Sequence, residues 1–342
     1  MVDLSTEYLG LKLETPVIAS SSGMTNTVDK IKKLAQNGAG AVVLKSIFEE
    51  EIAYEYADFM ESIKKSGAQQ QYFEYEGTTS QVAYYDYALR EENLKKNINL
   101  VKDSKKAVSI PIIASINCFM QSVEWLSYAK HLEDAGADAL ELNMFFPPTD
   151  LNRSADDTVK LYFAMVEQVT GSVGIPIALK ISHYFTDLGA MIQRLSNTGI
   201  KGLVLFNRFF SPDFDIEKYE VKPSFVFSNP GDLSLSLRWI AIMSEKVGCD
   251  LAASTGVHDG EALIKQLLAG AVAVQVASTL YQNGVGQIQA MLDSLEEWMK
   301  RKRFDSLSQF RGKLSQGKST DPSIYERVQF MRYFGGKKNV KM

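Results

Sequence analysis

The amino-acid sequence predicts an α/β protein, a (β/α)8 TIM barrel that occupies residues 1–342 as a single domain. Three observations lead to this fold class. Eight short apolar runs recur along the chain, amphipathic segments lie between them, and several of those segments end in glycine just before the next run. Eight strand–helix units form a closed parallel barrel whose active site lies at the carboxyl ends of the strands. A doubly wound open sheet is the alternative, and the number of units favours closure.

The predicted strands are nearly continuous apolar runs, as is typical of parallel strands that are buried on both faces. They span residues 16–20, 41–45, 111–116, 139–143, 177–180, 202–206, 251–254 and 273–276. Apolar residues at helical spacing predict helices over residues 30–36, 125–133, 161–169 and 262–268. Glycines stand where these or other helices should end before a strand, at Gly38, Gly136, Gly199 and Gly270.

Three other segments complete the predicted barrel. Residues 6–14 indicate a small N-terminal hairpin that caps the barrel bottom. The connections after the second and sixth strands are long, covering residues 46–91 and 207–232. Such loops on the catalytic face commonly form lids, substrate walls or dimer surfaces. The aromatic residues of the second loop predict a homodimer surface, with a lid over the ligand as the alternative.

The composition argues against several classes of protein. Hydrophobic residues make up 45% and charged residues 23%, which is ordinary for a globular chain with a large core. A net charge of -4 gives no electrostatic reason to expect nucleic acid or an anionic membrane as partner. The apolar runs are too short to cross a bilayer, and no secretory signal is visible. Two cysteines, Cys118 and Cys249, lack a CxxC spacing, so we expect no disulfide scaffold and no metal site, and a cytoplasmic location.

Polar residues follow the predicted strands at the end where a barrel opens onto its active site. Lys45 ends the second strand and Lys180 the fifth. A lysine beside a barrel core is costly unless an anion receives it. A reduced flavin, which carries negative charge along its N1–O2 edge, would be such an anion. A salt bridge to a loop carboxylate is the alternative for either lysine. The other strand-end residues are Ser20, Ser21, Ser46, Asn117, Asn143, Asn207 and Ser254.

The last two strands carry a pattern typical of phosphate binding. Thr255 and Gly256 follow the seventh strand, and Ala277 and Ser278 follow the eighth, each pair before a short helix. Small residues at these places let backbone N–H groups surround a phosphate. The loops after strands seven and eight are the usual phosphate site of barrels, although many unrelated barrels share it.

These residues resemble those of a known family. From about Leu9 to Leu314, the chain is similar to the soluble dihydroorotate dehydrogenases and to the flavin domain of dihydropyrimidine dehydrogenase. The resemblance is carried by residues 15–20 (TPVIAS), 43–46 (VLKS), 112–118 (IIASINC), 134–143 (DAGADALELN) and 310–314 (FRGKL). It implies bound FMN, oxidation of a CH–CH donor and, for the family, a place in pyrimidine biosynthesis.

The resemblance also implies which residues bind the FMN. The isoalloxazine would lie against Ala19, Ser20 and Ser21, and Lys180 would be near its N1–O2 edge. The full implied set is Ala19, Ser20, Ser21, Lys45, Ser46, Asn117, Asn143, Lys180, Asn207, Ser254, Thr255, Gly256, Ala277 and Ser278.

The segment after the fourth strand departs from the family pattern. Relatives carry Glu-Leu-Asn, two further residues, and then a catalytic cysteine, a proline and an asparagine. Here Phe146 stands at the cysteine position and Pro148 at the asparagine position, and residues 72–79 (YFEYEGTT) replace another expected asparagine segment. Phenylalanine cannot accept a proton, so we expect little oxidation of dihydroorotate and an altered substrate. Cys118 and His183 are weak candidates for a substitute base.

Several functions therefore remain open at the level of the sequence. The first is an FMN oxidoreductase with a changed, more apolar or aromatic substrate. The second is genuine dihydroorotate oxidation with a displaced base. The third is a flavoprotein that binds FMN without turnover, and the fourth is a dihydropyrimidine dehydrogenase-like subunit that receives electrons from another chain.

Overall fold

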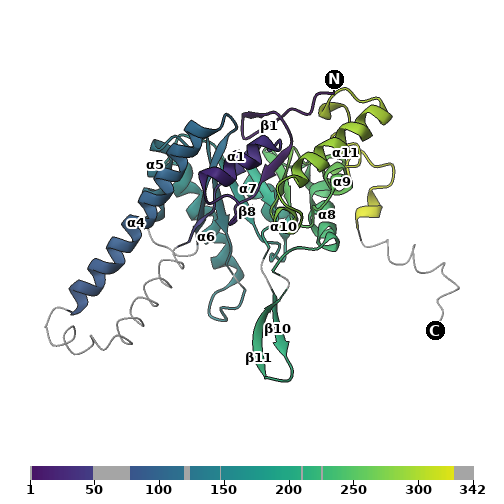
Figure 1. Ribbon diagram of the computed structural model, residues 1–342. Helices are drawn as coiled ribbons and strands as arrows, with labels where there is room; N and C mark the ends of the chain where they lie inside the picture. The colour runs from purple at the N-terminus through teal and green to yellow at the C-terminus, as the bar shows by residue number, and fades with distance from the viewer. Residues whose placement is uncertain are drawn as a thin grey trace.

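The computed structural model describes residues 2–48, 78–118, 124–146, 148–208, 211–224 and 226–326. Eight parallel strands close into a barrel surrounded by helices, which confirms the predicted fold class (Figure 1). In chain order the barrel strands are β3 (Val17–Ala19), β4 (Ala41–Val43), β6 (Ile112–Cys118), β7 (Ala139–Met144), β8 (Ile177–Ile181), β9 (Gly202–Leu205), β12 (Asp250–Ser254) and β13 (Ala273–Val276). Each pairs with the next, β13 pairs with β3, and β5 (Ile47–Phe48) extends the pairing along β6.

The N-terminal hairpin fills the bottom of the barrel. β1 (Thr6–Tyr8) and β2 (Leu11–Leu13) pair antiparallel, as predicted, and place Tyr8 and Leu9 among the inward-facing residues of the barrel strands. Gly202 makes this close approach possible, because a Cβ there would lie 2.6 Å from the Leu9 side chain. This apolar plug occupies one end of the barrel, and the polar side chains collect at the other.

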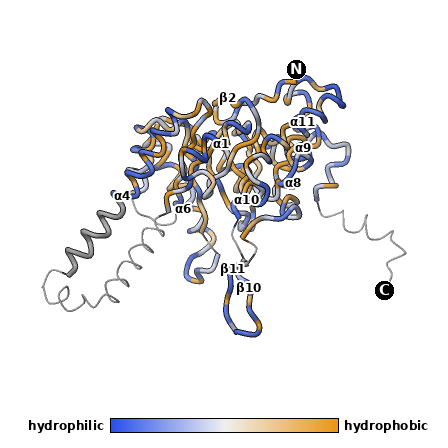
Figure 2. Tube along the Cα trace, in the orientation of Figure 1, coloured by the Kyte–Doolittle hydropathy of each residue, from blue (hydrophilic) through white to orange (hydrophobic). Residues whose placement is uncertain are grey.

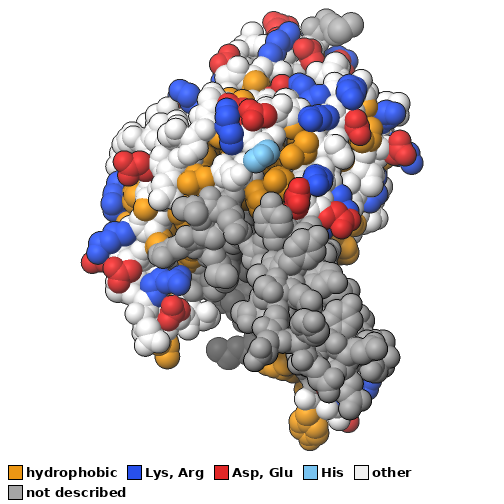
Figure 3. Space-filling view, turned by 90° about the vertical axis from the view of Figure 1, so that its left-hand side faces the viewer, with side chains coloured by type: hydrophobic (Ala, Val, Ile, Leu, Met, Phe, Trp, Pro, Cys, Tyr) orange, Lys and Arg blue, Asp and Glu red, His pale blue; other side chains and the backbone are white. Residues whose placement is uncertain are grey.

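A second and larger core lies between the strands and the helices. The helices are α1 (Val28–Gln36), α4 (Thr78–Ala107), α5 (Glu124–Asp134), α6 (Ala155–Thr170), α7 (Leu188–Ser196), α8 (Leu233–Met243), α9 (Gly260–Ala269), α10 (Ser278–Asn283) and α11 (Gln287–Lys302), with short 3-10 turns η1 (Pro230–Asp232), η2 (Leu307–Gln309) and η3 (Pro322–Tyr325). Apolar residues concentrate within the barrel body (Figure 2), and charges of both signs are interspersed over one outer face (Figure 3). Among the described residues, the helices fall short of the length and apolar character of a membrane span.

The turns from helix to strand use glycine as the sequence predicts. At α9 the side chain of Asp259 accepts a hydrogen bond from the Ala262 N–H at 2.8 Å, and Gly270 ends the helix in the left-handed conformation. Four glycines have φ between 85° and 120°, namely Gly38, Gly136, Gly199 and Gly270. Because side chains are disfavoured in that conformation, glycine at these positions directs each chain reversal into the next strand.

The predicted connection over residues 46–91 is wrong in its last part. α4 begins at Thr78, well before the predicted end of the loop. From Thr78 to Glu91 the sequence contains neither glycine nor proline, the two residues that most disfavour helix, so the helix can begin as early as Thr78. Residues 49–77, which include Tyr72 and Phe73, lie outside the described residues.

The second long connection, over residues 207–232, contains an antiparallel hairpin. β10 (Ser211–Asp215) pairs with β11 (Glu220–Ser224) and projects on the side of the barrel opposite β1 and β2 (Figure 1). Of the aromatic residues expected there, Phe214 and Tyr219 are 66% and 93% exposed. Phe209, Phe210 and Phe225 lie outside the described residues.

Candidate functional site

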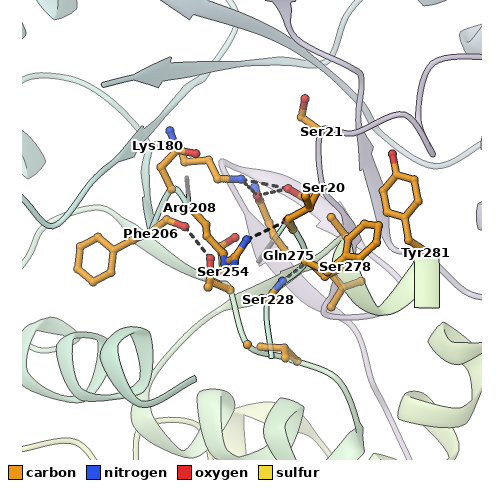
Figure 4. Close-up of a pocket in the computed structure, with 18 residues that line it drawn as sticks. Ser20, Ser21, Lys180, Phe206, Arg208, Ser228, Ser254, Gln275, Ser278 and Tyr281 are labelled. Carbon is orange, nitrogen blue, oxygen red and sulfur yellow. Dashed lines mark hydrogen bonds between the residues drawn. The ribbon is translucent and has the colours of Figure 1, made fainter. Parts of the chain in front are cut away.

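The predicted polar strand ends meet at the carboxyl end of the barrel. A cavity of about 440 Å³ opens there (Figure 4). The sequence-predicted residues that line it are Ser20, Ser21, Lys180, Asn207, Ser254, Thr255, Gly256, Ala277 and Ser278. Polar and aromatic lining residues that the sequence reasoning missed are Phe206, Arg208, Ser228, Gln275 and Tyr281, and Phe227 of the second long connection also lines the cavity.

Lys180 is held at the floor of the cavity by the hydrogen bonds that it donates to Gln275 of β13 and to Ser20, which follows β3. Its ammonium donates to Gln275 Oε1 at 2.8 Å and to Ser20 Oγ at 3.0 Å (Figure 4). Only 7% of the residue is exposed. A lysine ammonium has three donors, and these two bonds use two of them. The group is therefore fixed in direction and retains one donor for a ligand.

Glu141 lies beneath Lys180 in the barrel interior and is the nearest anion to it. Its Oε1 is 3.7 Å from the Lys180 ammonium, and its Oε2 accepts a hydrogen bond from the Gln275 amide. Glu141 is 1% exposed, and within the described part of the chain its Oε1 accepts no hydrogen bond. For Lys180, the sequence left a salt bridge to a loop carboxylate as the alternative to a flavin. A salt bridge is present, but its carboxylate comes from barrel strand β7 and not from a loop.

A chain of serine hydroxyls leads from the cavity-lining Ser21 into the protein. Ser46 Oγ lies 2.9 Å from Ser21 Oγ and 2.7 Å from Ser115 Oγ, and the Ser46 N–H donates to Ser21 Oγ at 2.9 Å. This chain joins the segments that follow β3 and β4 to the middle of β6. Lys45, beside Ser46, is half-buried, and Ala19 is fully buried in register with Val276.

Three predicted residues stand side by side because of strand register. Asn117 of β6 pairs with Asn143 of β7, which pairs in turn with Lys180 of β8. The amide of Asn207, beyond β9, donates to the Asn143 side-chain oxygen. The asparagines and the lysine therefore form one continuous polar rim.

The ends of β12 and β13 form a compact turn region. Thr255 and Gly256 have φ of 81° and 77°, and a Cβ on Gly256 would lie 2.1 Å from the Leu233 nitrogen. Ser278 is the first residue of α10, and its hydroxyl accepts a hydrogen bond from the Ser228 N–H at 2.9 Å. The N–H groups of a first helical turn have no carbonyl partner within the helix. This end of the cavity therefore presents backbone donors at close range.

Phe146 packs in the core. It is 8% exposed, its ring meets Tyr162 of α6 edge to face at 5.2 Å, and the Arg153 guanidinium lies 5.6 Å from its centroid. The side chain at the expected position of the base thus has close aromatic and cationic neighbours in and beside α6. Phe145, the preceding residue, contacts Tyr184 at 6.0 Å.

A second cavity of about 560 Å³ adjoins the first and shares five lining residues with it, including Asn207 and Arg208. Its aromatic wall consists of His183, Tyr184 and Phe206. The centroid of the His183 ring lies 4.4 Å from that of Tyr184 and 6.0 Å from that of Phe206. Burial lowers the pKa of His183 below its usual value. Its Nδ1 is buried and makes no hydrogen bond to any described residue.

Other sequence candidates are less well defined. Cys118 ends β6, and its side chain lies outside the described residues, as do Phe119 and Pro147. Across the described ranges, no three His, Cys, Asp or Glu residues are grouped as metal ligands would be.

Two of the missed residues had a signal in the sequence. Gln275 interrupts the apolar run Ala273–Val276, and Glu141 interrupts Ala139–Met144. A polar residue in the middle of a strand that is buried on both faces needs an internal partner. Arg208 and Ser228 carried no comparable signal. Both lie in the long connection over residues 207–232, where polar residues need no internal partner.

Known proteins share similarity with this chain over most of its length. The family model described as Dihydroorotate dehydrogenase matches residues 3–299. The catalytic subunit of dihydroorotate dehydrogenase B (NAD(+)) from Thermoplasma volcanium is 24% identical, over 91% of this chain and 98% of the relative. Dihydropyrimidine dehydrogenase (NADP(+)) from Arabidopsis thaliana is 23% identical, over 95% and 80%. A putative dihydroorotate dehydrogenase A (fumarate) from Aeropyrum pernix is 25% identical, over 91% and 97%.

Proposed function

The chain belongs to the dihydroorotate dehydrogenase family, and from that premise we propose that it is an FMN-dependent oxidoreductase of CH–CH donors. We place it in pyrimidine metabolism with its relatives, and we propose a substrate other than dihydroorotate. The observation that carries the flavin proposal is the buried Lys180 ammonium. Its hydrogen bonds to Ser20 and Gln275 hold it at the floor of the cavity. A bound flavin would supply the acceptor for a hydride from the substrate.

The residues at the cavity fit a flavin mononucleotide. Lys180 has a donor left for the electron-rich edge of the ring, and Glu141 keeps the site close to neutral without the ligand. At the far end, the turn at Gly256 has no room for a Cβ, so backbone can approach a phosphate closely. Between the two ends, Ser254 and Asn207 offer polar groups along one wall.

The altered substrate follows from the surroundings of Phe146. Its ring packs against Tyr162 and cannot exchange a proton, so a family-type base is missing at this position. The adjoining cavity instead offers aromatic faces and the half-buried imidazole of His183. We propose a planar, more apolar substrate there, with His183 as the group that exchanges its proton. Cys118 remains the alternative.

Two measurements test this function. Flavin-free protein should take up about one FMN per chain and quench its fluorescence, and a preparation that binds no FMN would overturn the proposal. The loaded protein should not be bleached by dihydroorotate in anaerobic stopped flow at enzyme-like rates of roughly 1–10³ per second, although dithionite bleaches it. Rapid reduction by dihydroorotate would overturn the proposal of an altered substrate and leave the proposal of FMN binding intact. If cyclic CH–CH donors all fail to bleach it, the non-catalytic flavoprotein is the better description.

We also propose a homodimer that uses the β10–β11 hairpin. Phe214, Ile216, Tyr219 and Val221 are 66–93% exposed on this short projecting element. Apolar side chains gathered on one projecting segment are typical of a protein interface. The two strands bury little of their own surface, so a second copy would give these side chains the contacts that they lack.

A further inference from the structure

Three segments that are distant in sequence meet behind the β12–β13 end of the cavity. Ser228, which follows the β10–β11 hairpin, lines the cavity and donates its N–H to Ser278 Oγ at 2.9 Å. Its hydroxyl lies 3.0 Å from Nε2 of His258, which follows β12. Ser228 and His258 are 5% and 9% exposed. This Ser228–His258 pair adjoins the residues that we assign to the phosphate.

His258 is fixed in place by two helices. Its carbonyl oxygen accepts a hydrogen bond from the Thr279 hydroxyl of α10 at 3.1 Å and from the Gln287 amide of α11 at 2.8 Å. The backbone of His258 is thus held twice, and because the residue is only 9% exposed the imidazole has little room to turn away from Ser228. An ordered imidazole that touches a cavity-lining hydroxyl is suited to control which way that hydroxyl points.

We propose that His258 is a positioning residue for the flavin phosphate and acts through the Ser228 hydroxyl; this proposal rests on the function proposed above. Its consequence is that the affinity for the phosphorylated flavin depends on pH. A hydroxyl has one proton to donate. When His258 Nε2 carries a hydrogen and donates it to Ser228 Oγ, the Ser228 proton is free for a phosphate oxygen. When Nε2 accepts instead, that proton is used inside the protein.

The charges around His258 set the direction of the pH effect. Burial lowers its pKa, while Asp259, the Ser228 backbone and Asp232 act in the opposite sense. Asp232 is in turn 3.5 Å from the Arg208 guanidinium, and the neighbours from α10 and α11, Thr279 and Gln287, are uncharged. A phosphate dianion beyond Ser228 adds negative charge and favours the imidazolium. Binding then takes up a proton, so affinity rises as pH falls.

The test compares FMN with riboflavin, which lacks the phosphate, on flavin-free protein by fluorescence quenching between pH 6.5 and 8.5. The phosphate itself titrates near pH 6, but this contribution is the same in every variant. H258Q keeps an N–H that can donate to Ser228 and cannot titrate. Relative to H258Q, the wild-type affinity for FMN should rise severalfold from pH 8.5 to 6.5, up to the limit of about tenfold that a shift of one pKa unit allows.

Two serine variants separate the local contact from general damage. S228A should lower the affinity for FMN roughly tenfold, as expected for loss of a hydrogen bond to a charged group, and leave that for riboflavin unchanged. S196A is the control, because Ser196 is 7% exposed, donates to the Gln193 carbonyl at 2.7 Å, and ends α7 near the opposite face of the barrel. It should change neither affinity.

The outcomes are distinguishable. Identical pH profiles for wild type and H258Q, or equal losses of FMN and riboflavin affinity in S228A, would overturn the role of His258 while FMN binding itself stands. Failure of the wild type to bind either flavin would overturn the proposed function, and the role of His258 with it.

Discussion

Replacement of Lys180 by methionine should destabilise the protein through the group that is left behind. Methionine keeps most of the side-chain volume but removes the ammonium. Glu141 is 1% exposed and lies 3.7 Å from that ammonium, so the variant retains a buried carboxylate without its cation. Gln275 and Ser20 also lose the donor that they share.

The size of the effect follows from this burial. Removing one partner of a buried ion pair typically destabilises a protein by about 3–5 kcal/mol. With an unfolding entropy of about 2.1 cal/mol/K per residue, a chain of 342 residues should lose about 4–7 °C in Tm. Replacing both partners removes the unpaired charge. The double variant Lys180→Met with Glu141→Gln should therefore recover most of the lost stability.

Urea unfolding of flavin-free protein, followed by circular dichroism, measures these differences directly. Lys96→Met is the matched control, because the Lys96–Glu92 pair is on the surface, with both side chains more than 60% exposed. Such i,i+4 pairs contribute about 0.3–0.5 kcal/mol. If Lys180→Met were as mild as the control, or if the double variant were no more stable than the single one, the buried pair would not have the role assigned to it.

Three further predictions concern other parts of the molecule. Gly256→Ala should lower both Tm and the affinity for FMN, because its Cβ would collide with backbone. Gly136→Ala has a φ of 97° but open space around it, so its free energy of unfolding should fall by only about 1–2 kcal/mol. Equal effects of the two variants on Tm would contradict this reasoning. Phe146→Cys should leave the rate of flavin reduction by dihydroorotate within severalfold of wild type, since residue 146 packs against α6; recovery of rapid reduction in stopped flow would show that it reaches the substrate. Phe214→Ser combined with Tyr219→Ser should convert the proposed dimer to monomers, measured by light scattering, with little change in Tm. A wild type that is already monomeric at micromolar concentration would refute the interface.

The sequence was sufficient for the barrel and for many of the polar residues that gather at the carboxyl ends of its strands. Eight buried apolar runs and the glycines between them are local features, and each predicted strand is found within two residues of its observed ends. Because the carboxyl ends of barrel strands share one face, Ser20, Lys180 and Asn207 could be grouped from their positions along the chain alone. The helical start of α4 was missed because the length of the connection suggested a loop and because Thr, Ser, Val, Tyr and Asp at its start have modest helix propensity.

Partners across the barrel could not be derived from the sequence. Alternation along a strand shows that Glu141 and Asn143 face the same side, but the neighbour of Glu141 depends on the register of every strand around the closed ring. The same holds for Ser228 and His258, which are thirty residues apart and meet only because a hairpin returns to the end of β12. The direction of Phe146 depends on the packing of α6, since its ring finds Tyr162 there. Local sequence thus determines which residues reach the site, and the closure of the barrel determines which of them touch, because contacts between distant segments are set by the geometry of the whole ring.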